Sequence, residues 1–127
     1  MVRNKVFIIS DYTDRRAALV ELVTGAGLDA AAVDSWEGWS GADQVLPAGC
    51  LVLSVAAGGL TCPERIALCK AMCTSYPVLV LTEVGDVPTA VEAMRQGAFH
   101  VMQVGQGQYG ILQRIRQMLE YPAGSSV

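Results

Sequence analysis

The sequence predicts an α/β fold in which a parallel sheet of five strands is covered by helices on both faces. Three observations lead to this prediction. Apolar, β-branched runs alternate along the chain with segments whose apolar residues recur at helical spacing. The runs are continuous rather than alternating, which is typical of strands buried on both faces. The length of 127 residues suits one domain with a single core.

The amino-terminal part of the chain contains the first two predicted strands and helices. The run KVFIIS, Lys5–Ser10, is the first strand. A helix begins near Arg15 and is predicted to end at the glycines of residues 25–27. LDAAAV, residues 28–33, is a weaker second strand. SWEGWSGADQV, residues 35–45, is expected to be a short helix weakened by two glycines, with Trp36 and Trp39 covering the core or, if exposed, anchoring a partner.

The third strand, residues 50–55, is followed by a helix with three start signals. Thr61 is the expected N-cap, Pro63 lies in the first turn and Glu64 is the capping-box partner. PVLVLT, residues 77–82, is the fourth strand. These alternating elements predict right-handed crossovers between parallel strands.

The carboxyl-terminal part adds one more strand and two helices. Asp86 is a candidate cap for a helix within residues 85–98, and Ala90, Val91 and Met94 are its expected buried face. FHVMQV, residues 99–104, is the fifth strand, and apolar residues within 111–119 predict the last helix.

Together these elements predict a doubly wound, flavodoxin-like (βα)5 fold with the strand order 2-1-3-4-5. In such sheets function is found at the carboxyl ends of the strands. We therefore expect the functional site at the strand ends, at Ser10, Asp11, Ser54, Thr82 and Val104.

Composition excludes several classes of function. The net charge is −3 and the basic residues are scattered, so we expect no direct nucleic-acid binding by this domain. No apolar run approaches the roughly 18 residues of a membrane helix, and the amino terminus does not resemble a signal peptide, so we expect a cytoplasmic protein. The four cysteines lack C-x-x-C spacing and are expected to be reduced and mostly packed, although Cys69 and Cys73 lie one helical turn apart and could bind a metal with Cys62.

Three segments resemble the receiver domain of two-component response regulators, and the resemblance extends over essentially the whole chain. PVLVLTEVGDVPTAVEAMRQGAFHVM, residues 77–102, is similar to the nitrogen-fixation type of regulator, while GCLVLSV and VFIISDYTD are similar to the third and first strands of the family. The resemblance implies that Thr82 is the residue that senses a phosphoryl group, and that Thr82 and Val101 occupy the switch positions.

The departures from the family bear directly on the chemistry. Ser54 stands where the family has its phosphoacceptor aspartate, Ser10 replaces one of the two acidic residues that hold magnesium, and Val104 replaces the lysine. AAGGLT, residues 56–61, replaces the usual loop after the third strand. An engineered aspartate-to-serine change would account for Ser54 but not for the other departures.

These departures predict a degenerate, or pseudo-, receiver that signals without aspartyl phosphorylation and is not an enzyme. Aspartyl phosphorylation needs a carboxylate nucleophile, a magnesium ion and a cationic side chain. We expect no metal site, with Asp11 as a residual ligand at most, and weak or absent magnesium binding. A small-ligand sensor that uses the vacated pocket near Asp11, Ser54 and Thr82 is an alternative.

The resemblance also implies how the domain would signal. Its expected partners are proteins, such as a sensor kinase, an output domain or a second copy in a homodimer. The expected contact surface extends over about residues 88–118 and includes Arg95, Gln96, His100, Gln103, Arg114 and Gln117. We expect residues 1–121 to form the domain and residues 122–127 to resemble a linker. A DNA-binding domain beyond it would indicate transcriptional control, and without one the chain would be a stand-alone adaptor.

Overall fold

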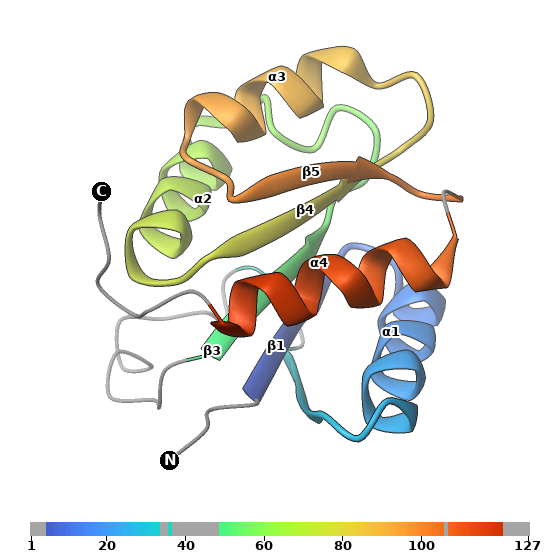
Figure 1. Ribbon diagram of the computed structural model, residues 1–127. Coiled ribbons are helices and arrows are strands. Elements are labelled where there is room, and N and C mark those ends of the chain that lie inside the picture. Colours follow the sequence, from blue (N-terminus) through green and yellow to red (C-terminus); the bar gives the residue numbers. More distant parts are fainter. Residues whose placement is uncertain (1–4, 34–35, 37–48, 106, 121–127) are drawn as a thin grey trace.

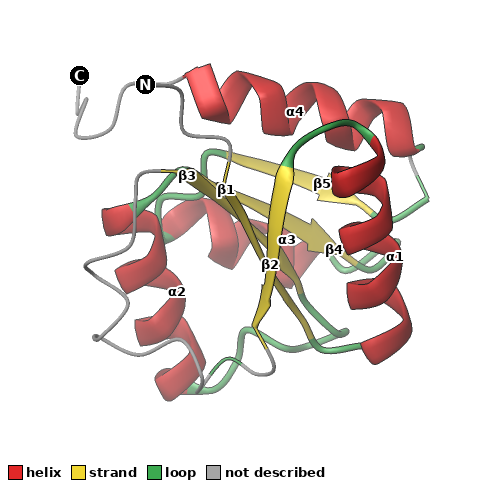
Figure 2. Cartoon of the chain, turned by 90° about the horizontal axis from the view of Figure 1, so that it is seen from below, coloured by secondary structure: helices red, strands yellow, loops and turns green. Residues whose placement is uncertain are grey.

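Five parallel strands lie side by side in the order β2-β1-β3-β4-β5, as the sequence predicts (Figures 1 and 2). The computed structural model describes residues 5–33, 36, 49–105 and 107–120. The elements in chain order are β1 (Lys5–Ser10), α1 (Thr13–Gly25), β2 (Asp29–Val33), β3 (Gly49–Ser54), α2 (Pro63–Ser75), β4 (Val78–Thr82), α3 (Val87–Arg95), β5 (His100–Gln103) and α4 (Gln108–Glu120).

The helices cover the two faces of the sheet in pairs. Helices α2 and α3 lie on one face, and α1 and α4 lie on the other (Figure 2). Successive side chains of a strand point to opposite faces. Leu51 and Leu53 of β3 accordingly pack towards α2, while Cys50 and Val52 pack towards α1 and α4. This two-sided burial explains why the strands appear in the sequence as continuous apolar runs.

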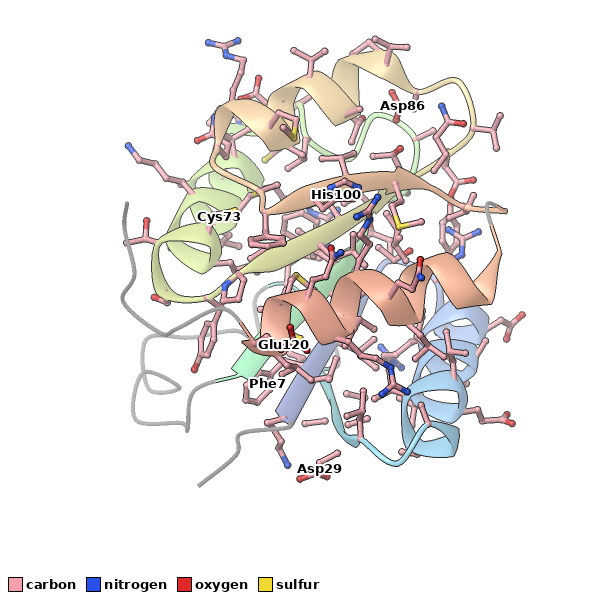
Figure 3. The ribbon with its side chains drawn as sticks, viewed as in Figure 1. Phe7, Asp29, Cys73, Asp86, His100 and Glu120 are labelled. Atoms are coloured by element: carbon pink, nitrogen blue, oxygen red, sulfur yellow. The ribbon has the colours of Figure 1, made fainter. Side chains whose placement is uncertain are left out.

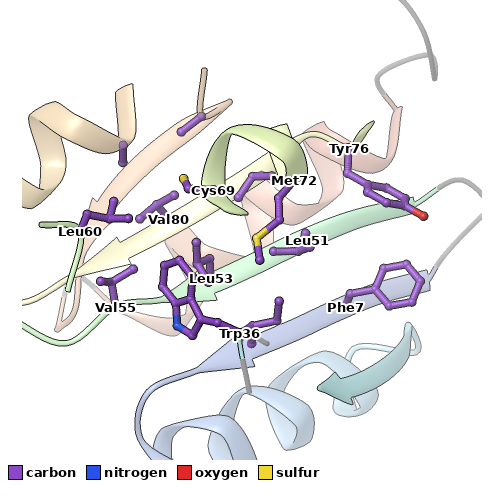
Figure 4. Close-up of a cluster of buried hydrophobic side chains, with 14 residues drawn as sticks. Phe7, Trp36, Leu51, Leu53, Val55, Leu60, Cys69, Met72, Tyr76 and Val80 are labelled. Atoms are coloured by element: carbon purple, nitrogen blue, oxygen red, sulfur yellow. The ribbon is translucent and has the colours of Figure 1, made fainter. Parts of the chain in front are cut away.

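Trp36 is the described residue of the predicted helix 35–45, and it is buried as predicted. Its side chain is 1% exposed and lies beside Leu53 in the cluster on the α2 face (Figure 4). Trp39 and the rest of that predicted helix, like the linker-like tail from residue 122, lie outside the described residues. No described helix is both long enough and apolar enough to cross a membrane.

The start of α2 differs from the prediction. Cys62, not Thr61, is the N-cap residue, and no side chain caps the helix. The Thr61 hydroxyl instead donates to the carbonyl of Gly58 at 3.0 Å, and the Glu64 carboxylate accepts a hydrogen bond from Cys62 Sγ. Pro63 does lie in the first turn. The prediction of a capping box was therefore wrong, because the preceding turn takes the Thr61 hydroxyl.

The buried face of α3 was also predicted incorrectly. Asp86 is the N-cap, as predicted, but the buried side chains are Thr89 and Ala93. Val91 and Met94 are 52% and 56% exposed. The small side chain of Ala93 packs against the sheet, and this orientation turns the larger apolar residues of α3 towards solvent.

Candidate functional site

The carboxyl ends of β1, β3 and β4 bring the positions predicted from the sequence together at one edge of the sheet. Ser10 pairs with Ser54 in the register of β1 and β3. The Asp11 amide donates to the Ser54 carbonyl at 3.1 Å, and the Val104 amide donates to the Thr82 carbonyl at 2.8 Å. Ser10, Ser54 and Thr82 are buried, with exposed fractions of 5%, 0% and 1%. The carboxyl ends of these strands therefore carry three buried hydroxyl side chains.

Asp11 is the carboxylate at the centre of this edge, and both of its oxygens are engaged by the protein. Oδ1 accepts from the indole nitrogen of Trp36 at 2.9 Å, and Oδ2 accepts from the amide of Ala56 at 2.8 Å. Arg65 pairs with both oxygens at 3.0 Å. The guanidinium of Arg65 also lies 4.3 Å from the ring centroid of Trp36, a cation–π distance. These contacts compensate the negative charge of Asp11 and fix the orientation of its carboxylate.

Ser54 lies next to a second arginine. Arg15 Nη1 is 3.4 Å from Ser54 Oγ and 2.6 Å from Glu83 Oε2. Arg15 comes from the first turns of α1, and Glu83 directly follows β4. The guanidinium of Arg15 also lies 4.6 Å from the ring centroid of Tyr12. Arg15 thus connects the ends of β3 and β4 at the position where the serine hydroxyl is buried.

The remaining strand-end residues have local roles. Ser10 Oγ donates to the carbonyl of Tyr12 at 2.9 Å and lies 3.0 Å from its amide, a local turn contact typical of serine. Val104 packs against the cluster under α1 and α4. Thr82 differs from both, because its Oγ1 is buried and has no hydrogen-bond partner in the described part of the chain.

The loop between β3 and α2 holds the site together through two glycines. Gly58 has a φ of +69°, which suits glycine, and its amide donates to Asp86 Oδ2 at 3.0 Å. At Gly59 a Cβ atom would lie 2.5 Å from Val55 Cγ1 and 2.8 Å from the Ala56 carbonyl. The tight loop thereby aims the Ala56 amide at Asp11 and connects this edge with the start of α3, where Figure 3 labels Asp86.

Asp86, at the start of α3, is a carboxylate with several hydrogen-bond donors around it. It accepts from Thr89 Oγ1 at 2.6 Å, from the Thr89 amide and from the Gly58 amide. The hydrogen bonds from the Thr89 hydroxyl and from Gly58 lower the pKa of Asp86. Among the described residues, no group of three or more His, Cys, Asp or Glu side chains is arranged to hold a metal ion.

The residues predicted for a partner surface lie on α3, β5 and α4, with β5 between the two helices (Figure 1). Arg95 is 71% exposed and Gln103 is exposed. Burial lowers the pKa of His100 on β5, and the nearby charge of Arg114 on α4 lowers it further. Gln96, the residue after α3, hydrogen-bonds to Glu92 of that helix, and Arg114 hydrogen-bonds to Gln117 within α4. Val101 is half-buried and packs against the cluster on the α2 face.

Sequence reasoning missed Arg15, Arg65 and Glu83, which supply the charged partners of the site. A signal for them was present. In a parallel α/β sheet each helix begins just after the carboxyl end of a strand, so first-turn residues lie near that edge. Arg15 and Arg65 both occur within the first three residues of a helix, and Glu83 is the first residue after β4.

Comparison with known proteins places these features in context. No family model matches the chain. The chain is 34% identical over 96 residues to the transcriptional regulatory protein FixJ of Bradyrhizobium diazoefficiens, which covers 76% of this chain and 47% of that protein. It is 34% identical over 93 residues to FixJ of Azorhizobium caulinodans, covering 73% of this chain and 44% of that protein. The chain thus spans about half the length of these relatives.

Similarity to solved structures extends over the whole domain. The crystal structure of FixJ-N superposes with a TM-score of 0.82 at 25% sequence identity, covering 97% of this chain and 98% of that one. Full-length FixJ from B. japonicum gives a TM-score of 0.77 at 26% identity, covering 94% of this chain and 59% of that one.

Proposed function

The chain is homologous to the receiver domains of response regulators, and from that premise we propose that it is a pseudo-receiver, which signals by protein contact without aspartyl phosphorylation. The observation that carries this proposal is the set of partners at the strand ends. Asp11 is held by Arg65, Trp36 and Ala56, and the position expected for the acceptor holds a buried serine.

Ser54 is a poor nucleophile in these surroundings. A serine hydroxyl needs an adjacent base that takes its proton. The side chain in contact with Ser54 Oγ is the guanidinium of Arg15, which carries donors and no acceptor. Phosphoryl transfer to this hydroxyl is therefore disfavoured by its neighbour as well as by its burial.

The donor set also does not fit magnesium. Magnesium prefers near-octahedral oxygen ligands and is usually bound through one or two carboxylates. Both oxygens of Asp11 already accept hydrogen bonds, and a cation placed there would meet the positive charge of Arg65. Glu83 is paired with Arg15. We infer that magnesium binds weakly or not at all. A small ligand that bound to Asp11 would likewise have to displace its contacts with Trp36, Ala56 and Arg65.

The proposed output is contact with a protein partner through α3, β5 and α4. Val87, Val91 and Met94 are between 52% and 61% exposed on α3, and Arg95 lies at the end of the same helix. Apolar residues bordered by polar ones are typical of contact surfaces. Because the relatives are named transcriptional regulatory proteins, we propose that the contact serves transcriptional control through an attached or partner DNA-binding domain.

Incubation with acetyl phosphate and magnesium tests this proposal. We expect intact mass spectrometry to find no added phosphoryl group, and we expect amide shifts around Thr82 to stay unchanged. Millimolar magnesium alone is expected to leave the melting temperature unchanged. A stoichiometric adduct that survives Ser54→Ala and disappears in Asp11→Asn would be an aspartyl phosphate and would overturn the proposal. An adduct that disappears in Ser54→Ala would instead be a phosphoserine and would contradict the inference that Ser54 is a poor nucleophile.

A further inference from the structure

A groove opens between α3 and β5, the outermost strand of the sheet on this side, and neither Asp11 nor Ser54 lines it. It has a volume of about 450 Å³. Its walls are Ala90 and Met94 of α3, Thr82 at the end of β4, and the whole of β5 from His100 to Gln103. We call it the edge groove. Its volume lies within the range of pockets that bind small molecules.

One residue that lines the edge groove has a buried hydroxyl with no partner in the described part of the chain. Thr82 is 1% exposed, and its Oγ1 makes no hydrogen bond with any described residue. Thr82 lies two residues after Val80, whose side chain packs on the face covered by α2 and α3, so the Thr82 side chain points to the same face. A buried hydroxyl that lacks a hydrogen bond is destabilising, and such groups are uncommon in folded proteins. Because Thr82 also lines the groove, a small shift of its side chain would bring this hydroxyl to a molecule bound there.

The chemistry of the walls defines what the groove accepts. Ala90, Met94, Val101 and Met102 offer apolar surface, and no Asp, Glu, Lys or Arg occurs among the described residues that line the groove. Burial and the charge of Arg114 lower the pKa of His100, which favours its neutral form at neutral pH. A charged ligand would lose hydration without gaining a counter-charge.

We propose that the edge groove binds a small neutral molecule with an apolar body, about the size of a substituted benzene ring, and a hydroxyl or carbonyl group that hydrogen-bonds to Thr82. The groove shares Thr82 with the strand-end residues, but neither Asp11 nor Ser54 lines it. A ligand seated between α3 and β5 would act on the surface proposed for partner contact.

Two probes of matched shape test the proposal. Phenol and toluene are titrated into the isotope-labelled full chain, and amide shifts are followed at Thr82, Val101 and Met102. We expect both probes to shift these amides, with phenol binding about five- to tenfold more tightly because it alone can bond to the Thr82 hydroxyl. In Thr82→Val the affinity for phenol is expected to fall to that for toluene. Equal affinities in the unchanged protein would overturn the proposal, since the ligand would then not hydrogen-bond to Thr82.

A second pair of variants tests the location. Val101→Phe fills the groove from β5 and is expected to abolish the shifts caused by both probes. Val84→Phe adds the same ring at a residue that is 72% exposed and is not part of the groove lining, and it is expected to leave binding unchanged. Unchanged binding in Val101→Phe, or no saturable shift in the unchanged protein, would overturn the proposal. The amide spectra of β1 and β3 report whether each variant is folded, and the phenol–toluene comparison needs no variant.

Discussion

Arg65 and Asp11 form a bidentate ion pair at the carboxyl edge of the sheet, with both nitrogen–oxygen distances at 3.0 Å. The side chains are 28% and 11% exposed, so the pair is largely shielded from solvent. Removing one partner of a shielded pair leaves the other charge uncompensated. We therefore predict that Arg65→Met lowers the free energy of unfolding by roughly 2 kcal/mol, measured by urea denaturation.

Lys70→Met on the exposed side of α2 is the matched control for Arg65→Met. It removes a cation from the same helix, away from Asp11, and should change stability by less than about 0.5 kcal/mol. Equal losses in the two variants would mean that Arg65 contributes only general charge or helix effects. The Arg65–Asp11 pair would then have no stabilising role.

The pair between Arg15 and Glu83 is predicted to couple α1 to the residue that follows β4. Its side chains are 29% and 27% exposed, and the atoms are 2.6 Å apart. In a double-mutant cycle with Arg15→Met and Glu83→Gln, we expect a coupling free energy of about 1 kcal/mol. Additive effects of the two changes would contradict this, and 1 M salt should weaken the coupling only in part because the pair is half-buried.

Asp86 is predicted to make stability depend on acid pH. Hydrogen bonds from Thr89 and Gly58 lower its pKa below the ordinary 3.8. A carboxyl whose pKa is lower in the folded state stabilises the fold above its unfolded pKa, and this contribution is lost as the pH falls through the folded value. Asp86→Asn should therefore lower the melting temperature at neutral pH. The difference in melting temperature between Asp86→Asn and the unchanged protein should shrink as the pH falls below 3.8.

Glu21→Gln is the control for the Asp86 experiment. Glu21 is an exposed carboxylate in the middle of α1. Its replacement should leave the melting temperature nearly unchanged at every pH. A difference for Asp86→Asn that stays constant across the acid range would show that the hydrogen bonds do not depend on the charge of Asp86.

The corrected orientation of α3 leads to a prediction with a built-in comparison. Val91 is 52% exposed and Val80 is fully buried. Val91→Ala should be neutral or slightly stabilising, because alanine has the higher helix propensity. Val80→Ala should cost about 2 kcal/mol or more, since it leaves a cavity in the core. A loss for Val91→Ala similar to that for Val80→Ala in denaturant unfolding would restore the face predicted from the sequence.

The central strands β1, β3 and β4 were predictable because burial on both faces leaves a strong local signal. The strand order followed from the alternation of strands and helices, which is typical of a doubly wound sheet. The bounds of β1 match the prediction residue for residue. The face of α3 was not predictable in this way, because Val91 and Met94 are apolar yet face solvent and only the packing of Ala93 decides the orientation. The cap of α2 was missed for a similar reason, since the Thr61 hydroxyl bonds to the preceding turn.

The site was predictable only in part. Asp11, Ser54 and Thr82 are fixed by the ends of strands, so pattern and topology place them. Their partners depend on long side chains that reach across the edge. Arg65 contacts Asp11 across 54 residues of sequence, and Arg15 contacts Glu83 across 68. No local pattern encodes such pairings. The position of both arginines in the first turns of helices does limit which side chains can reach the carboxyl ends of the strands.

The four cysteines are predicted to differ sharply in reactivity. Cys62 is exposed, Cys73 is half-buried, and Cys50 and Cys69 are buried. Burial raises the pKa of Cys50 to about 12, so very little thiolate exists there at neutral pH, and the pKa of Cys73 is raised by its hydrogen bond with Cys69 and by burial. We expect one thiol to react rapidly with an aromatic disulfide reagent in the folded protein, and all four to react in denaturant.

Replacement of a single cysteine tests the assignment. In Cys62→Ser the rapid phase should disappear, while Cys73→Ser should leave it intact. The slow phases then report how often the core opens, and they should accelerate in Arg65→Met if the Asp11 pair stabilises the folded state. A rapid phase that persists in Cys62→Ser would mean that the reagent reaches Cys69 or Cys73 of α2 without unfolding of the protein. The packing of α2 against the sheet would then be looser than its buried side chains indicate.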